Sequence, residues 1–194
     1  SLILRISSLP LHLWTTQSRT TVSSAGWKST SSICMCQPDK HSIFFDGGYG
    51  VKTTEGWKRL TKREAKGNFE IIESFRSQKY SKTMLSPSDV SSKPLGLRLE
   101  IVPQKNPFAI KVGETLPIKA LFEGKPLQGA TIKAGCTYER KLKEYQATDK
   151  DGIANIVIEK SGNQIIATSY KTPLKDDPDA DTLSLSTNIV FEVK

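Results

Sequence analysis

The last twelve residues of the chain alternate strictly between two kinds of side chain. One series is largely apolar and comprises Leu183, Leu185, Thr187, Ile189, Phe191 and Val193, whereas the residues between them are mostly polar. This period of two predicts a β-strand with one face in a hydrophobic core and the other face largely in water. Whatever fold this chain adopts must therefore bury one face of a sheet at its C-terminal end.

Shorter segments of the same kind precede this strand from residue 95 onward. We expect strands at residues 97–101, 108–112, 116–122, 130–134, 145–147, 154–158 and 165–169. Turns that contain glycine separate several of them, because glycine accepts the positive φ angles that tight turns require. About seven short strands at such intervals predict an all-β fold, with an immunoglobulin-like β-sandwich over residues 95–194.

Residues 43–94 are expected to form a smaller, incomplete β-rich module. A short strand at 43–45, a hairpin turn at Asp46-Gly47-Gly48 and a returning strand at 49–53 open it. Residues 58–66 predict a basic loop or a single helical turn, and 69–75 alternate again. The segment 86–94 is rich in Ser and Pro, which favours a linker, and we place the domain boundary there.

The first 42 residues predict a poorly ordered or atypical tail. Fourteen of residues 1–32 are Ser or Thr, and no acidic residue precedes Asp39. Residues 1–13 are too interrupted for the apolar region of a signal peptide, so we expect that such a peptide is not present in this chain. No stretch approaches the roughly 20 apolar residues of a membrane-spanning helix, and no transmembrane segment is expected.

The positive charge of the chain is concentrated in its first half. The formal net charge is +8, of which residues 1–94 carry +7 and residues 95–194 carry +1. The basic residues are scattered rather than gathered with aromatic residues on one stretch, and this pattern does not favour nucleic acid as a partner.

Four carboxylates in six residues are the first candidate for a metal site. Asp176, Asp177, Asp179 and Asp181 fall on one loop, where a hard cation such as Ca²⁺ would relieve their mutual repulsion. The alternative is a solvated acidic loop relieved by Lys171 and Lys175. The turn Asp149-Lys150-Asp151-Gly152 is a weaker candidate of the same type, because its residues already have a role in a turn.

Histidine and cysteine provide the other candidate ligands. His12 and His41 are the two histidines, 29 residues apart, and the simpler interpretation of each is an exposed imidazole without a partner. Cys34-Met35-Cys36 offers soft ligands that suit Cu(I) or another thiophilic ion, but no second Cys or His pair completes a tetrahedral site, and two incidental thiols are the alternative.

Motifs for catalysis are absent from the sequence. It contains no phosphate-binding glycine loop, no GxSxG elbow and no HExxH helix. We therefore predict a protein that is not an enzyme.

Several segments, taken in order, resemble the DUF4198 family. They include Asp46-Gly47-Gly48-Tyr49-Gly50-Val51-Lys52-Thr53, Glu55-Gly56-Trp57-Lys58, Ser77-Gln78-Lys79-Tyr80-Ser81-Lys82, Asn106-Pro107-Phe108 and Val112-Gly113-Glu114-Thr115-Leu116-Pro117. The resemblance spans about residues 43–194. Near its N-terminus the family carries a His-Asp-x-Trp-like motif, to which His12-Leu13-Trp14 corresponds in part. Its Gly-Tyr-Gly-His-like motif is missing here, and Gly50 stands where the family tends to have an aromatic residue.

The resemblance implies a bacterial β-sandwich protein exported to the periplasm, with no enzymatic activity. It also implies a role in nickel or cobalt uptake, and hence Ni²⁺ or Co²⁺ as a bound ion and a metal-uptake membrane complex, or another protein, as the partner. Two hypotheses follow. The first is a periplasmic accessory or binding protein of metal uptake, and the second is a β-sandwich structural or protein-interaction module with no metal role.

Overall fold

The computed structural model describes residues 17–21, 31–37, 40–87 and 93–194, the first two ranges by their backbone alone. Strands dominate these residues and form two sheets, which confirms the predicted all-β sandwich. The only helical segments described are α1 (Lys62–Ala65) and a 3₁₀ turn, Pro107–Ala109. No helix in the described part of the chain has the length and apolar character needed to cross a membrane.

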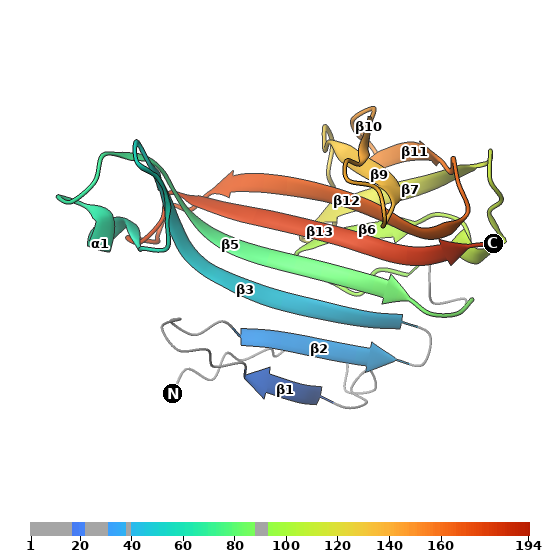
Figure 1. Cartoon of the computed structure of the whole chain (residues 1–194), viewed down its shortest axis with the longest axis horizontal. Coiled ribbons are helices and arrows are strands. Elements are labelled where there is room, and N and C mark those ends of the chain that lie inside the picture. The colour runs from blue at the N-terminus through green and yellow to red at the C-terminus, as the bar shows by residue number, and fades with distance from the viewer. Residues whose placement is uncertain (1–16, 22–30, 38–39, 88–92) are drawn as a thin grey trace.

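The larger sheet is built mainly from four long strands that lie side by side. Among the described residues its strand order is β1-β2-β3-β5-β13-β12-β9-β10, and β4 pairs with β3. The strands are β1 (Gln17–Thr21), β2 (Ser31–Gln37), β3 (Lys40–Thr53), β4 (Gly56–Lys58), β5 (Ile71–Met84), β9 (Ile132–Cys136), β10 (Lys143–Tyr145), β12 (Gly162–Pro173) and β13 (Thr182–Val193). Figure 1 shows that β3, β5, β12 and β13 run the length of the molecule.

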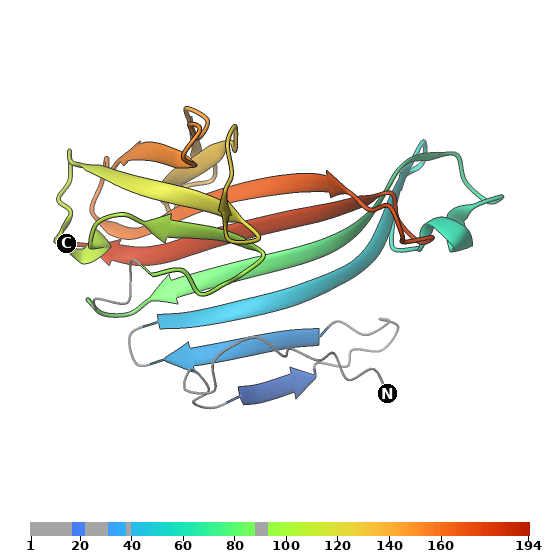
Figure 2. The ribbon, with the colours of Figure 1, turned by 180° about the vertical axis from the view of Figure 1, so that it is seen from behind.

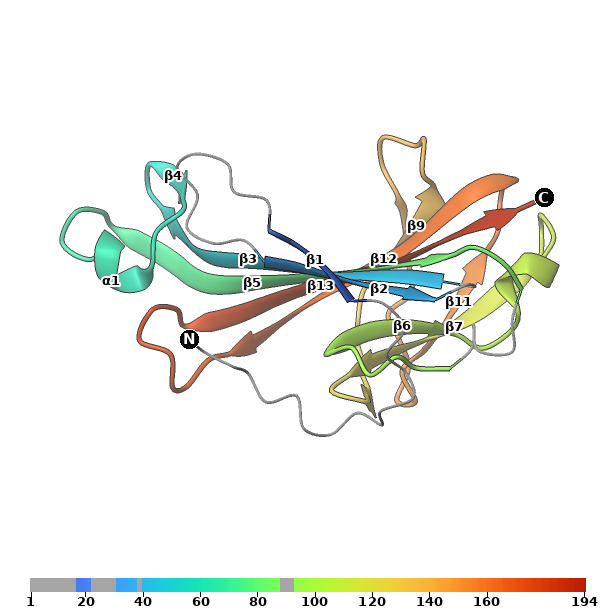
Figure 3. The same ribbon diagram turned by 90° about the horizontal axis from the view of Figure 1, so that it is seen from below.

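The smaller sheet covers one half of the larger sheet. It contains β6 (Leu99–Pro103), β7 (Thr115–Phe122), β8 (Lys125–Pro126) and β11 (Ile153–Val157), in the order β11-β7-β6 with β8 paired to β7. Seen from behind, β6 and β7 lie against the C-terminal half of β13 (Figure 2). The other half of the large sheet projects beyond the sandwich and carries α1 (Figure 3). We call residues 49–76 and 173–182 the distal end.

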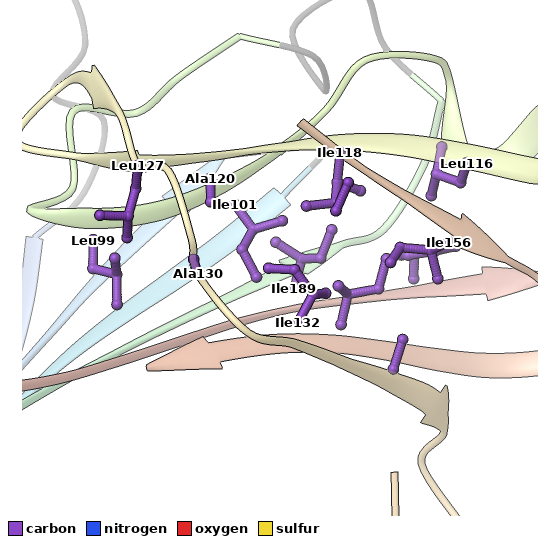
Figure 4. Packing of buried hydrophobic residues seen from close by; sticks show 14 of the residues in the cluster. Leu99, Ile101, Leu116, Ile118, Ala120, Leu127, Ala130, Ile132, Ile156 and Ile189 are labelled. Carbon is purple, nitrogen blue, oxygen red and sulfur yellow. The ribbon is translucent and has the colours of Figure 1, made fainter. Parts of the chain in front are cut away.

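Between the two sheets lies the main hydrophobic core. Ile101, Ile118 and Ile156 from the small sheet meet Ile132 and Ile189 from the large one, and all five are at most 1% exposed (Figure 4). The closing strand contributes as predicted, because each residue of its largely apolar series is buried, whereas Glu192 is exposed. The alternation read from the sequence therefore gives the correct register of β13.

Two neighbouring residues of β13 test this register. Phe191 is 1% exposed and Glu192 lies on the opposite face. We expect Phe191→Ala to lower the free energy of unfolding by about 3–5 kcal/mol, because it leaves a cavity in a packed core. Glu192→Ala should change it by no more than about 0.5 kcal/mol. Denaturant melts of both variants measure the difference, and a larger loss for Glu192→Ala would contradict the register.

The hairpin predicted at Asp46-Gly47-Gly48 is wrong, because β3 passes through this segment without reversing. Asp46 pairs with Gln78 and Gly48 with Ser77, so Gly47 is an extra residue in a β-bulge. Gly48 has a φ of 69° and donates its N–H to the Asp46 carboxylate at 3.0 Å. The Asp-Gly-Gly segment therefore forms a bulge within one continuous strand and does not close a hairpin.

Two further predictions differ from the structure. β5 does not end near residue 75 but continues through polar residues to Met84, since it is paired on both sides with β3 and β13. The strand predicted at 108–112 is replaced by the 3₁₀ turn, because Pro107 has no N–H and the Asn106 side chain accepts the N–H of Phe108. Residues 17–21 and 31–37, within the predicted tail, form two neighbouring strands at one side of the large sheet through backbone pairing, and the atypical tail stays a prediction.

The expected domain boundary at 86–94 lies between strands that share one sheet. β5 precedes the boundary and β13 follows it, and the two pair in parallel from Thr182↔Phe75 to Val190↔Thr83. The residues before and after the boundary are therefore joined by backbone hydrogen bonds. The boundary stays a prediction about separate folding units.

A buried ion pair joins the two sheets near this boundary. Lys82 of β5 donates to Glu100 of β6 at 3.0 Å, and the two side chains are 2% and 1% exposed. Glu100 also accepts the backbone N–H groups of residues 95, 96 and 97. Burial lowers the pKa of Lys82, while the Glu100 carboxylate acts in the opposite direction.

Removing the carboxylate should damage the protein more than removing the ammonium. Glu100→Ala leaves a buried lysine and several backbone N–H groups without their acceptor, and we expect a loss of about 3–5 kcal/mol of stability. Lys82→Met should cost less, because Glu100 keeps its backbone donors. Chemical unfolding of the two variants gives the order, and the reverse order would contradict this account of the pair.

Candidate functional site

The first turn of helix α1, at the distal end, is stabilised by a capping box. The Thr61 hydroxyl accepts the N–H of Glu64, and the Glu64 carboxylate accepts the N–H of Thr61, which forms a reciprocal capping box. Ala65 is fully buried, as are Val51 of β3 and Ala180 in the loop between β12 and β13. This single helical turn confirms one of the two alternatives predicted for residues 58–66.

The acidic loop predicted as a metal site lies directly against this helix. Asp179 accepts two hydrogen bonds from the Arg63 guanidinium, at 2.6 and 2.8 Å, and its carbonyl accepts the Lys62 N–H at 2.8 Å. Asp181 pairs with the Lys62 ammonium and accepts a hydrogen bond from Ser74 at 2.5 Å. Two of the four carboxylates are therefore neutralised by cations of α1.

The other two carboxylates of the loop have different surroundings. Asp177 accepts the Tyr49 hydroxyl at 2.9 Å and the backbone N–H of Asp179 at 2.9 Å. Asp176 is exposed. Three of the four side chains thus contact separate partners instead of converging on a common point.

These contacts shift the pKa values of the loop. The Arg63 hydrogen bonds lower the pKa of Asp179, and hydrogen bonds from Lys62 and Ser74 lower that of Asp181. Burial, followed by the hydrogen bond to Asp177, raises the pKa of Tyr49. Asp179 and Asp181 are therefore held in their charged form by basic residues that lie more than a hundred positions earlier in the chain.

The predicted metal ligands are not brought together in the part of the chain that the structure describes. Within it, no three side chains of His, Cys, Asp or Glu are grouped so as to hold an ion. His12 lies outside the described residues. His41 is exposed on β3, at the end of that strand opposite the acidic loop. Asp149 caps its own turn by accepting the N–H groups of Asp151 and Ile153, both at 2.9 Å.

An aromatic cluster that the sequence analysis did not single out lies on the other face of the distal end. Trp57 is 63% exposed, and its ring meets Phe75 edge-on at 5.5 Å. The Lys52 ammonium lies over the Trp57 ring at 5.7 Å from its centre. Cross-strand pairing of Lys52 with Trp57 and of Gly50 with Phe75 produces this arrangement, and a linear sequence does not reveal such pairing.

Gly50 explains how Phe75 is fixed beneath Trp57. A Cβ atom at position 50 would lie 2.6 Å from the tip of the Phe75 ring, so the ring occupies the space that a side chain would need. A larger side chain at this position would displace Phe75. In this chain, the aromatic surface is instead supplied from the neighbouring strand.

A small cavity near β9 is the remaining feature with a potentially reactive group. Its volume is about 30 Å³, enough for a water molecule or two, and its lining includes Cys136 and Gln164. Cys136 is buried, and its sulfur accepts a hydrogen bond from Gln164 at 3.3 Å. This cysteine is a structural residue rather than an exposed nucleophile.

The protein is therefore an all-β sandwich with a projecting distal end. This end carries the exposed Trp57 on one face and the ion pairs between α1 and the acidic loop on the other. The chain matches the family model described as a domain of unknown function, DUF4198, over residues 12–172. This match covers most of the chain, and the protein belongs to that family. The match begins at His12, the residue that the resemblance pairs with the N-terminal motif of the family. Neither the curated proteins nor the solved structures gave a match.

The link between α1 and the acidic loop can be tested by titration. Arg63→Ala should raise the pKa of Asp179 toward its usual value of 3.8, because the main cause of the lowering is removed. Since a carboxylate with a lowered pKa stabilises the folded state above its unfolded pKa, the wild-type contribution should be lost as the pH falls below about 3.8. NMR titration of the Asp side-chain carbons measures this.

Lys66→Ala is the matched control, because Lys66 is an exposed cation next to the same helix. It should leave the Asp179 titration close to that of the wild-type protein. Equal shifts in the two variants would mean that general charge, and not the Arg63 contact, controls the loop.

Proposed function

We propose that this protein is a non-enzymatic binding protein that docks to a protein partner through the distal end, with Trp57 at the centre of the contact. The observation that carries the proposal is the exposed indole of Trp57, which meets the Phe75 ring edge-on and has the Lys52 ammonium over its own ring. From the family resemblance we further propose a periplasmic location and a partner that belongs to a nickel or cobalt uptake system.

Exposure and support of the Trp57 ring both favour a docking role. A tryptophan leaves a large apolar area in water when it is 63% exposed, and tryptophan is among the residues most enriched at the energetic centres of protein interfaces. The contacts with Phe75 and Lys52 restrict its motion before binding. Less conformational entropy is then lost when a partner covers it.

Charge around Trp57 indicates what kind of surface the partner presents. The segment 51–60 contains Lys52, Lys58 and Arg59 but a single acid, Glu55, which pairs with Lys58 at 3.5 Å. This local excess of positive charge favours a partner with an apolar pocket for the indole and an acidic rim. Ile72, 58% exposed at the start of β5, adds apolar area at the same end.

A module with no role in metal uptake is the second candidate function. It is supported by the acidic loop, where Asp177, Asp179 and Asp181 each contact a residue of the protein itself. In that case Trp57 serves a partner unrelated to metal ions.

Genetic complementation separates the two candidates and tests the docking site. In cells that lack the endogenous gene, the wild-type chain should restore Ni²⁺ or Co²⁺ uptake and copurify with subunits of the uptake complex from detergent-solubilised membranes. Trp57→Ala should reduce both by about tenfold or more, because loss of a central interface residue typically costs at least about 2 kcal/mol.

Tyr138→Ala is the control, because Tyr138 is 67% exposed but lies in the sandwich half of the molecule. It should behave as the wild-type chain does. Equal loss in the two variants would contradict a docking site at Trp57. Unchanged metal uptake on deletion of the gene would contradict the metal-uptake role and leave the interaction module as the function.

A further inference from the structure

A shallow hollow lies on the face of the large sheet that is turned away from the small sheet. Side chains on β13 alternate between the core and this face, so Ser186 and Asn188 are on the side away from the core. The hollow has a volume of about 480 Å³, which is within the range of small-molecule sites. Among its lining residues are Lys133, Glu144, Ala167, Ser169, Ser186 and Asn188.

One row of paired residues crosses the hollow from β10 to β13. Glu144 pairs with Lys133, and Lys133 pairs with Ala167. Ala167 in turn pairs with Asn188. The Glu144 carboxylate lies 3.7 Å from the Lys133 ammonium, so these two charges offset each other. The side-chain oxygen of Asn188 accepts the Ser81 hydroxyl at 2.8 Å, which leaves its NH₂ group to donate to a ligand.

The neighbouring row carries two hydroxyl groups and a positive charge. Ser169 pairs with Ser186, and Ser186 pairs with Lys79 of β5. The half-buried Phe45 of β3 lies opposite Lys79. Lys79 is exposed and forms no ion pair with another residue that the structure describes. This row therefore offers groups that donate and accept hydrogen bonds, beside a cation that is available to a ligand.

We propose that this hollow binds an acidic oligosaccharide, with sugar hydroxyls on Ser186 and Asn188 and a uronate carboxylate on Lys79. Serine hydroxyls both donate and accept, and the asparagine amide donates, which matches the paired donors and acceptors of sugar hydroxyl groups. The carboxylate complements the charge of Lys79. Phe45, beside Lys79, adds an aromatic ring against which the apolar face of a sugar can pack.

A peptide fits the same surface less well. An added strand needs a sheet edge with unpaired backbone groups, whereas β9, β12 and β13 are each paired on both sides. A helical partner needs apolar pockets, and Ala167 is the one apolar residue in the lining of the hollow. The hollow belongs to the sandwich half and Trp57 to the distal end, so the proposed docking function and this site can fail separately.

Titration of the isotope-labelled full-length chain with trigalacturonic acid, followed by NMR, tests the proposal. The backbone amide signals of residues 167–169 and 186–188 should shift and saturate. Lys79→Ala should weaken binding by about threefold or more, because the carboxylate loses its cation. Ser186→Phe should abolish binding, because the ring would fill the hollow. Maltotriose, a neutral saccharide of the same length, should bind at least about threefold more weakly than trigalacturonic acid.

Lys150→Ala and Trp57→Ala are the matched controls. Lys150 is an exposed cation in the turn before β11 of the small sheet, and Trp57 is the exposed ring of the distal end. Both variants should bind trigalacturonic acid as the wild-type chain does, and circular dichroism of every variant checks that the sheets are intact. Absence of binding, an equal loss in either control, or equal affinity for the two saccharides would overturn the site.

Discussion

The buried ion pair between Lys82 and Glu100 is the constraint that fixes how the two sheets meet. Burying two charges costs several kcal/mol for each ion, and this cost is offset only by good geometry and additional hydrogen bonds. Glu100 obtains these bonds from the backbone of residues 95–97, so the chain entering β6 is held in place by the same carboxylate. The ion pair thereby helps to fix the small sheet over one half of the large sheet, and the other half extends beyond the sandwich.

The bulge at Gly47 determines which residues the projecting half presents on each face. Before the bulge, Phe44 packs on Tyr80 at the inner face; after it, Tyr49 and Val51 take the inner positions. Tyr49 can therefore donate to Asp177, while Lys52 lies on the outer face beside Trp57. Because side chains alternate with a period of two, a β3 strand without the extra residue would exchange these two sets.

A strand that alternates between apolar and polar residues could be predicted from the sequence, whereas a strand with polar residues at inner positions could not. In β13 the alternation gave the correct face for each residue, because its inner side packs in a core and its outer side is polar. In β5, by contrast, Lys82 occupies an inner position, and only its ion pair with Glu100 makes that possible. Nothing in a linear pattern marks a lysine as buried when its partner lies on another strand.

Contacts between residues far apart in the chain also explain why the sequence predicts only part of each site. The acidic loop was found by its composition, but its partners Lys62 and Arg63 lie more than a hundred residues away. Exposed ion pairs contribute little individually, and this network gains its effect from the bidentate Arg63 contact and the capped helix beneath it. The carboxylates therefore brace the distal end from its inner side, and the exposed indole of Trp57, where we propose that a partner docks, lies on the outer side of the same end.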